Sequence, residues 1–307
     1  MSQIQCVGIV GAGMMGTGIA EVAAAAGIPT VVVKATPGAL DGARAGFSKA
    51  LAHKVEKGRL DASTADEILG RIDWTTERER LALADIVIEC IVEDLPAKQR
   101  LFADLEARVP EGTIFASNTS TLRIADIAKD CGRKGRMIGM HFFSPVPAMK
   151  LVELAHLPAT RPEVLGAAAA FIRTLGKTAV PVLDSMGLVV NRLLLPYLIG
   201  AISAYEQGLA RPEEIDTAMR LGCGHPVGPL ALADVIGLDV VYTMAKLLHA
   251  EFQDPRYQPP AILRRLVQAG QLGKKAKLGF YDYATEPPRA NGEIWELVRG
   301  SGKEQAC

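Results

Sequence analysis

The chain has 307 residues with 34 basic and 34 acidic side chains, and its formal net charge of zero argues against nucleic acid as an electrostatic partner. Apolar residues make up 49% of the sequence, and a chain of this length can form about two domains with large cores. The 30 glycines gather in short motifs rather than in low-complexity runs, which argues against disordered and collagen-like classes.

The cysteines and the first residues indicate a reducing compartment. The five cysteines include no Cys-x-x-Cys pair and their number is odd, so neither a disulfide framework nor a zinc site is expected. No pair of histidines has the spacing of metal ligands, and we predict no metal. Residues 1–10 hold no basic region of the kind that opens a signal peptide, and no run of about 18 apolar residues predicts a membrane span. The expected location is the cytoplasm.

The first half of the chain alternates short β-rich runs with amphipathic stretches. Strands are expected at residues 6–10, 30–33, 85–92, 113–116, 136–140, 151–154 and 179–183. A helix of small residues is expected at residues 13–26, ended by Gly27. Continuous apolar runs without alternation are typical of strands covered on both faces. The pattern therefore predicts an α/β fold with a parallel sheet.

Between residues 33 and 85 the apolar pattern changes to helical spacing, and no strand is expected there. Phe47, Leu51 and Val55 recur at every fourth residue. The basic residues around them are Lys49, Lys54, Lys57 and Arg59. We therefore expect a helical insertion with a basic face.

The second half loses the β signal from about Gly187 onward. Helices are expected at residues 188–207, 236–249 and 261–269. Another helix begins at Pro212, because a proline followed by two glutamates suits the first turn of a helix. We expect one domain at residues 1–184 and an all-α C-terminal domain at residues 185–307. The polar tail at 286–307 holds Trp295 as its one large apolar residue.

Gly11, Gly13 and Gly16 form a G-x-G-x-x-G motif between the first strand and the first helix. Gly11 permits the tight turn, Gly13 lets the backbone approach a pyrophosphate, and Gly16 allows close packing of helix and strand. The pyrophosphate would lie at the helix N-terminus, beside Met14 and Met15. This context predicts a Rossmann-like dinucleotide-binding domain, and the alternative is a glycine-rich turn in another α/β fold.

The residue at the end of the second strand departs from the pattern of NAD-binding domains. An Asp or Glu is expected there to bind the ribose hydroxyls, and this chain has Lys34. A lysine cannot accept those hydrogen bonds, but it can pair with the 2′-phosphate of NADP, with Thr36 as a second donor. The alternative is a solvated lysine and NAD bound without the acid, so both NAD and NADP stay open as cofactors.

Several motifs across both halves point to one family. Ser117 begins SNTS, His141 begins HFFSP, Glu153 lies in LVEL, and Asn191 lies in GLVVNR. Further motifs are HPVGPL at 225–230, LGKK at 272–275 and GFY at 279–281. Together with the glycine motif they closely resemble the L-3-hydroxyacyl-CoA dehydrogenase family, which includes the 3-hydroxybutyryl-CoA dehydrogenases. The resemblance covers about residues 4–283.

The expected chemistry needs a base. Oxidation of a secondary alcohol releases a hydride and a proton, and histidine suits the proton transfer near neutral pH. The chemistry and the resemblance assign His141 as this base and Glu153 as the carboxylate that orients its ring. Ser117 and Asn191, the latter from the helical domain, would hydrogen-bond the substrate's oxygens. The alternatives are a structural histidine at a strand end, a solvated Glu153, and turn or helix-cap roles for Ser117 and Asn191.

The resemblance also implies contacts with the cofactor and with coenzyme A. Glu93 and Lys98 would line the nicotinamide side of the cofactor, and Lys57, with Lys54, would hold the phosphates of coenzyme A. The alternatives are charges at a helix start for the first pair and a solvated basic face for the second. Ser144 departs from the family, which commonly has Asn at this position.

These observations predict an NAD(P)-dependent oxidoreductase that interconverts an L-3-hydroxyacyl-CoA and a 3-oxoacyl-CoA of short chain length. The long apolar helices of the second half predict a homodimer. One alternative is a related dehydrogenase of a hydroxy acid without coenzyme A, such as a sugar acid. A second is a non-catalytic cofactor-binding protein, against which the joint presence of His141, Glu153, Ser117 and Asn191 argues.

Overall fold

The computed structural model describes residues 3–34, 40–292 and 294. The chain divides into two compact units, Met1–Leu188 and Val189–Cys307. Thr36, and Trp295 with the rest of the tail beyond it, carried expectations from the sequence and lie outside the described residues.

The first unit is built on a sheet of eight strands, counted over the described residues, in the order β3-β2-β1-β4-β5-β6-β7-β8. The strands are β1 (Val7–Val10), β2 (Thr30–Val33), β3 (Ile72–Thr75), β4 (Ile86–Glu89), β5 (Ile114–Ser117), β6 (Met137–Phe142), β7 (Leu151–His156) and β8 (Thr178–Leu183). Strands β1 to β6 are parallel, β7 runs antiparallel to β6, and β8 is parallel to β7. The order of the first six strands is that of the dinucleotide-binding fold, with its topological switch point between β1 and β4.

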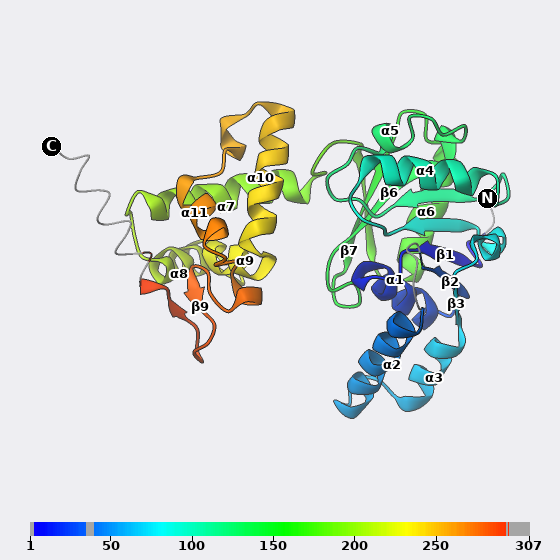
Figure 1. The fold of residues 1–307 in the computed structure, drawn as a ribbon, viewed down its shortest axis with the longest axis horizontal. Helices are drawn as coiled ribbons and strands as arrows, with labels where there is room; N and C mark the ends of the chain where they lie inside the picture. Colours follow the sequence, from blue (N-terminus) through cyan, green and yellow to red (C-terminus); the bar gives the residue numbers. More distant parts are fainter. Residues whose placement is uncertain (1–2, 35–39, 293, 295–307) are drawn as a thin grey trace. The chain divides into compact units, whose positions relative to one another are not determined.

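Helices cover both faces of this sheet (Figure 1). They are α1 (Met14–Ala25), α2 (Asp41–Glu56), α3 (Ala62–Gly70), α4 (Leu95–Glu106), α5 (Ile124–Ile127) and α6 (Pro162–Thr174), with 3-10 turns η1 (Arg78–Leu83) and η2 (Lys134–Arg136). Helices α2 and α3 form the expected helical insertion between β2 and β3. Phe47 and Leu51 are its buried apolar residues on α2.

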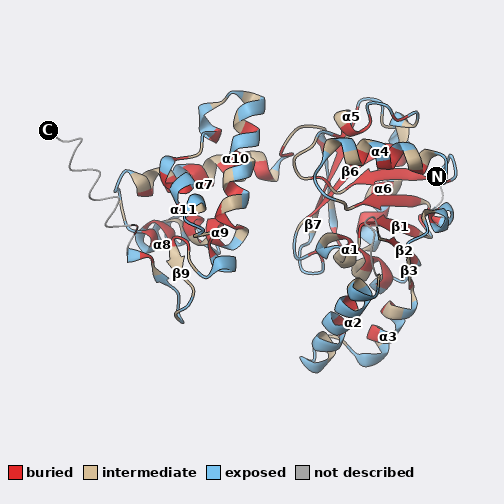
Figure 2. Ribbon diagram, in the orientation of Figure 1, coloured by how far each residue is buried: buried red, intermediate tan, exposed pale blue. Residues whose placement is uncertain are grey.

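Strands β1, β2, β4, β5 and β6 are buried on both faces, because their side chains alternate between two cores (Figure 2). Ile9 packs in one core with residues of α1 and α6, including Ala20 and Ile172. Its neighbour Val10 packs in the other core with residues of α4 and α5, such as Phe102. This arrangement explains why the strands read as continuous apolar runs.

The expectation that no strand lies between residues 33 and 85 was wrong. Strand β3 pairs in parallel with β2 at the edge of the sheet, with Ile72 opposite Thr30. It has four residues, of which Ile72 alone is buried, so its sequence lacks the apolar run of an interior strand. Such an edge strand is stabilised by its tertiary pairing more than by its own composition.

The second unit is mainly helical, as expected. Its elements are α7 (Val190–Glu206), α8 (Pro212–Cys223), α9 (Pro229–Ile236), α10 (Leu238–Phe252), α11 (Ala261–Gln268), η3 (Pro255–Tyr257), η4 (Lys274–Ala276), β9 (Tyr281–Asp282) and β10 (Arg289–Ala290). Pro212 is at the start of α8, and the Arg211 backbone N–H donates to the side chain of Glu214 at 2.8 Å. This capping box confirms the helix start inferred from the sequence.

Two local details of the second unit differ from the sequence pattern. The antiparallel pair of β9 and β10 interrupts the all-helical pattern, although each strand has only two residues. The helix expected at 236–249 begins two residues later, because Gly237 adopts a φ of +104° and separates α9 from α10. Within the described ranges no helix combines the length and apolarity that a membrane span requires.

Candidate active site

The loop after β1 has a backbone that requires glycine at two positions. Gly11 has a φ of +120°, and a Cβ added there would lie 2.4 Å from the carbonyl oxygen of Cys90. A Cβ at Gly16 would lie 1.8 Å from the carbonyl oxygen of Gly11. Any side chain at either position would therefore displace the loop from β4 or lift α1 from the sheet.

The N-terminus of α1 has open space in front of it. Gly13 caps the helix, and a Cβ added there would meet no atom within 4 Å. The next residue, Met14, is 74% exposed, whereas Met15 packs partly against the core. No acidic residue stands in the first turn of α1, so the unpaired N–H groups and the helix dipole favour an anion there. The loop thus fits the pyrophosphate of a dinucleotide.

A cavity of about 670 Å³ borders this loop. Lys34, which follows β2, lines it together with Arg78 and Arg100. Among the described residues that line the cavity, none is acidic. Cys90 also lines it, and burial raises the pKa of the Cys90 thiol, which makes this thiol unreactive at neutral pH.

His141 and Glu153 form a buried pair on neighbouring strands. They are register partners across β6 and β7, so their side chains point to the same face of the sheet. His141 Nδ1 lies 2.9 Å from Glu153 Oε2, and their side chains are 9% and 1% exposed. The ring of Phe143 packs against the imidazole, with ring centres 4.5 Å apart. These contacts orient the imidazole and leave Nε2 as the ring nitrogen that faces away from Glu153.

The end of β5 is fixed to β6 next to this pair. Asn118 Oδ1 accepts a hydrogen bond from the backbone N–H of Phe142 at 2.9 Å. Asn118 was not among the expected site residues, although it is the second residue of the SNTS motif. It holds the segment after β5 beside His141 and thereby places the SNTS loop at the same edge of the sheet.

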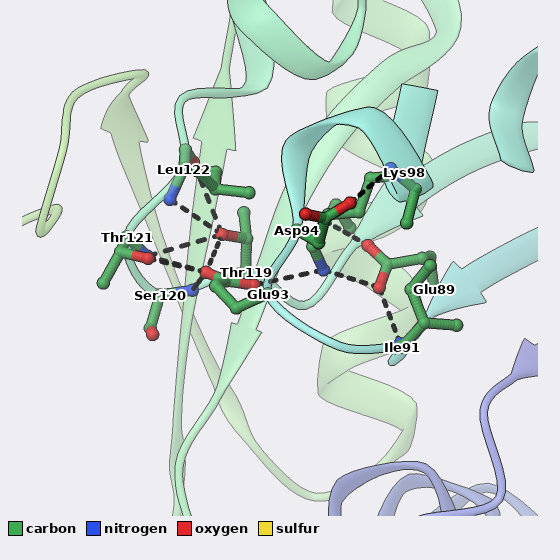
Figure 3. Close-up of polar contacts among 11 residues, drawn as sticks. Glu89, Ile91, Glu93, Asp94, Lys98, Thr119, Ser120, Thr121 and Leu122 are labelled. Atoms are coloured by element: carbon green, nitrogen blue, oxygen red, sulfur yellow. Dashed lines mark hydrogen bonds and ion pairs between the residues drawn. The ribbon is translucent and has the colours of Figure 1, made fainter. Parts of the chain in front are cut away.

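Ser117 does not have the position that its expected role requires. Its side chain is fully buried at the end of β5, and its Oγ donates to Glu89 Oε2 at 2.6 Å. A hydroxyl with no exposed surface is not positioned to bind a substrate. The half-buried hydroxyl of the same motif is Ser120, which points away from the neighbouring polar network in Figure 3.

Glu89 is the centre of a buried charged network at the end of β4 (Figure 3). Its Oε1 accepts hydrogen bonds from Lys98 Nζ at 2.6 Å and from the backbone N–H of Ile91 at 2.7 Å. Lys98 Nζ also lies 3.2 Å from Glu93 Oε2. The Lys98 side chain is 2% exposed, and its ammonium pairs with both Glu89 and Glu93. The sequence signal for Glu89 was a carboxylate within the apolar run DIVIEC.

Glu93 connects this network to the SNTS loop. Its Oε1 accepts hydrogen bonds from the hydroxyls of Thr119 and Thr121 and from the backbone N–H groups of Ser120 and Thr121. Burial alone would raise the pKa of the Glu93 carboxyl, but the charge of Lys98 and the two hydroxyl donors outweigh it and lower this pKa. Glu93 is therefore ionised near neutral pH and fixes the loop that carries Ser120.

The two lysines expected to hold coenzyme A lie on and just after α2. Lys54 forms an ion pair with Glu21 of α1, so part of its charge is already neutralised within the protein. Lys57 is exposed at the C-terminal cap of the helix. Of the two, Lys57 has the more accessible ammonium.

The remaining expected residues lie in separate places. Asn191 belongs to the second unit, where it is buried in the first turn of α7. Ser144 is exposed three residues after His141. Over the described part of the chain, no three His, Cys, Asp or Glu side chains gather as metal ligands would.

The residues of the first unit share one edge of its sheet. Gly11, Lys34, Glu89 and Ser117 all stand at or just after the carboxyl ends of parallel strands, and His141 is the penultimate residue of β6. In open α/β sheets, ligands bind at this edge beside the switch point. The edge combines an anion-binding loop, a cationic cavity and a His–Glu pair, which together suit a dinucleotide-dependent proton and hydride transfer.

Comparison with known proteins divides the chain close to the boundary between the two structural units. Residues 6–185 match the family model described as "3-hydroxyacyl-CoA dehydrogenase, NAD binding domain", and residues 187–283 match "3-hydroxyacyl-CoA dehydrogenase, C-terminal domain". The chain is 44% identical to a probable 3-hydroxybutyryl-CoA dehydrogenase of Bacillus subtilis, over 92% of this chain and 98% of that protein.

Two crystal structures are similar over nearly the same span. The (S)-3-hydroxybutyryl-CoA dehydrogenase of Ralstonia eutropha has a TM-score of 0.87 and is 42% identical, covering 92% of this chain and 100% of that one. FadB2 of Mycobacterium tuberculosis has a TM-score of 0.88 and is 41% identical, with the same coverage. The similarity therefore extends through both units.

Proposed function

Because the chain belongs to the 3-hydroxyacyl-CoA dehydrogenase family, we propose that it interconverts an L-3-hydroxyacyl-CoA and the corresponding 3-oxoacyl-CoA. A short acyl chain, as in 3-hydroxybutyryl-CoA and acetoacetyl-CoA, is supported by the names of its relatives. The observation that carries the proposal is the buried pair of His141 and Glu153 at the carboxyl edge of a dinucleotide-binding sheet.

We assign the proton transfer to His141. Its Nδ1 faces Glu153, so Nε2 takes the hydroxyl proton of the substrate during oxidation and returns it during reduction. The Glu153 carboxylate holds the ring in one orientation and stabilises the imidazolium that forms. A bound nicotinamide supplies the other half of the reaction by accepting or donating the hydride.

We assign the binding of the substrate's oxygens to Ser120 and Asn191. Ser120 replaces Ser117 in this role because its loop is fixed by Glu93 while its hydroxyl is not buried in the network. Asn191 keeps the role expected from its motif. A hydroxyl and an amide both donate to a carbonyl oxygen and would hold the reacting carbon in place.

Coenzyme A and a second subunit complete the proposal. Lys57, with a smaller part for Lys54, binds a phosphate of coenzyme A.

The second unit exposes apolar side chains on its helices, including Leu193, Val235 and Leu247, which supports association through this unit into a homodimer. Sedimentation equilibrium gives the mass in solution, and a monomer at micromolar concentration would contradict this part.

The decisive experiment is acetoacetyl-CoA reduction with NADH and with NADPH. His141→Ala should lower kcat by about 10²–10⁴, the usual contribution of a general acid or base, with little change in cofactor affinity. The matched control is His156→Ala, which removes a half-buried histidine from β7. Near-normal kcat in His141→Ala would refute the mechanism. Equal turnover of acetoacetate and acetoacetyl-CoA would favour the hydroxy-acid alternative.

A further inference from the structure

Three cationic side chains from separate segments line one cavity at the carboxyl edge of β1 and β2. Lys34 follows β2, Arg78 begins η1, and Arg100 lies on α4. The cavity has a volume of about 670 Å³, within the range of small-molecule sites, and it continues to the glycine loop at Gly11 and Gly13. Because the loop fits the pyrophosphate of a dinucleotide, the cavity is where the adenosine end would lie.

The charges that line this cavity are unsuited to the unmodified ribose of NAD. NAD-binding domains place a carboxylate at the end of the second strand, where it accepts hydrogen bonds from the ribose hydroxyls. Here Lys34 has that position, and none of the described residues that line the cavity is acidic. Ammonium and guanidinium groups donate hydrogen bonds and accept none. A fully ionised phosphate monoester has hydrogen-bond acceptors and no donors, and it carries about −1.5 to −2 charges at pH 7.

Arg78 is held in place by a carboxylate outside the cavity. Its Nη1 donates to Asp104 Oδ2 at 2.7 Å, and Asp104 also pairs with Arg108. Burial alone would raise the pKa of Asp104, but hydrogen bonds from the two arginines lower it, so this anchor is ionised at neutral pH. A guanidinium has five N–H donors, and the ion pair leaves donors available to a ligand.

Arg100 adds a second guanidinium on the α4 side. It is exposed, and no acidic side chain among the described residues pairs with it. Planar guanidinium groups bind phosphate oxygens in pairs of parallel hydrogen bonds, which gives geometry as well as charge. With Arg78 and Lys34, three positively charged residues from three separate segments line the cavity.

We propose that Lys34, Arg78 and Arg100 form a binding site for the 2′-phosphate of NADP(H), so that this chain prefers NADP(H) to NAD(H). The proposal rests on the proposed function, since it concerns the cofactor of the same reaction. It adds to that function in two ways. It assigns a phosphate-binding role to two arginines that the sequence did not indicate, and it selects NADP(H) over NAD(H) as the cofactor.

The test compares two adenosine fragments that differ only in the 2′-phosphate. Isothermal titration calorimetry measures the affinity of the full chain for adenosine 2′,5′-bisphosphate and for adenosine 5′-monophosphate. The bisphosphate should bind at least about tenfold more tightly, and added salt should reduce the difference. Arg78→Gln and Arg100→Gln should each weaken the bisphosphate about three- to tenfold and leave the monophosphate unchanged.

Two further variants complete the experiment. Lys34→Asp should reverse the preference of the fragments and shift the NADH/NADPH ratio of kcat/KM by roughly tenfold or more towards NADH, because attraction is replaced by repulsion. Arg80→Gln is the matched control: Arg80 lies in the same 3-10 turn as Arg78, pairs with Asp73 at 2.6 Å, and does not line the cavity. It should change neither affinity.

Equal affinity for the two fragments would overturn the proposal. Equal weakening of both fragments by the arginine variants would also overturn it, because the arginines would then contact the part that the fragments share. In either case, acetoacetyl-CoA reduction by NADH that depends on His141 would leave the proposed function standing. The absence of reduction with either cofactor would instead refute the proposed function.

Discussion

His141 on β6 and Glu153 on β7 are directly opposite each other in an antiparallel pair, and 2.9 Å separates Nδ1 from Oε2. Twelve residues separate them in the chain, and the turn after β6 returns the strand so that both side chains reach the same face. Glu153 is almost completely buried, so its charge acts on the imidazole with little screening by solvent.

Glu153→Gln should therefore lower kcat by about tenfold or more, because a neutral amide can orient the ring but does not stabilise the imidazolium. Glu163→Gln, an exposed change in the first turn of α6, is the control. An unchanged kcat in Glu153→Gln would show that the carboxylate does not act on the base.

Ser120→Ala and Ser117→Ala should have different effects. Ser120→Ala should lower kcat/KM for the acyl-CoA while the thermal stability stays close to that of the parent. Ser117→Ala removes a buried donor to Glu89 and should destabilise the protein by about 1–3 kcal/mol. Steady-state kinetics and thermal melts on both variants decide the assignment. Loss of activity without loss of stability in Ser117→Ala would return the substrate contact to Ser117.

Lys98→Met should destabilise the protein by about 3–5 kcal/mol, because it leaves the buried Glu89 carboxylate without its cation. Adding Glu89→Gln should recover part of this loss, since the buried charge is then absent. Denaturant unfolding of the two single variants and the double variant gives the coupling free energy. Additive effects would contradict a direct interaction between Glu89 and Lys98.

Lys57→Ala should raise KM for an acyl-CoA by an amount equivalent to about 1.5–3 kcal/mol for a charged phosphate contact, or less if the contact is exposed. Lys54→Ala should have a smaller effect, because Lys54 already pairs with Glu21. A truncated thioester without the nucleotide phosphates should show no difference between Lys57→Ala and the parent. Lys129→Ala, an exposed lysine on the same unit, is the control. Equal changes in KM for full and truncated substrates would exclude a phosphate contact.

The free energy of unfolding of the second unit should fall as pH rises from about 4 to above 6, because the buried carboxyl of Asp234 then ionises. Burial raises the pKa of this carboxyl to about 6, although the backbone N–H groups of Tyr281 and Phe280 donate to it. Because the pKa is raised, the folded state binds this proton more tightly than the unfolded state does. The resulting stabilisation is complete at pH values below the pKa of Asp234 in the unfolded chain, and it is lost as pH rises past about 6. The other ionisable groups that affect it are Tyr283, which donates to it, and Asp216.

The measurement for Asp234 is denaturant unfolding of the parent and of Asp234→Asn between pH 4 and pH 8. The parent should lose about 1–3 kcal/mol more than the variant over this range, because an amide does not titrate. The absolute stability of the variant does not matter, since the comparison is between slopes. Parallel pH dependences in the two proteins would show that Asp234 is ionised in both the folded and the unfolded state.

The sequence by itself determined the features that depend on local pattern. The glycine motif, the apolar runs of the interior strands and the start of α8 at Pro212 follow from backbone sterics, two-sided burial and helix capping, which act over a few residues. His141 and Glu153 could also be found from the sequence, because their motifs and the chemistry of alcohol oxidation point to the same residues.

The tertiary structure decided everything that depends on which distant segments meet. Four-residue β3 forms because β2 offers a partner, and Ser117 is buried because Glu89, 28 residues earlier, reaches its hydroxyl. Arg78 and Arg100 follow Lys34 by 44 and 66 residues in the sequence, yet all three line the same cavity. Neither arginine stands in a motif, because a cationic cavity needs charge at a point in space and no particular spacing along the chain.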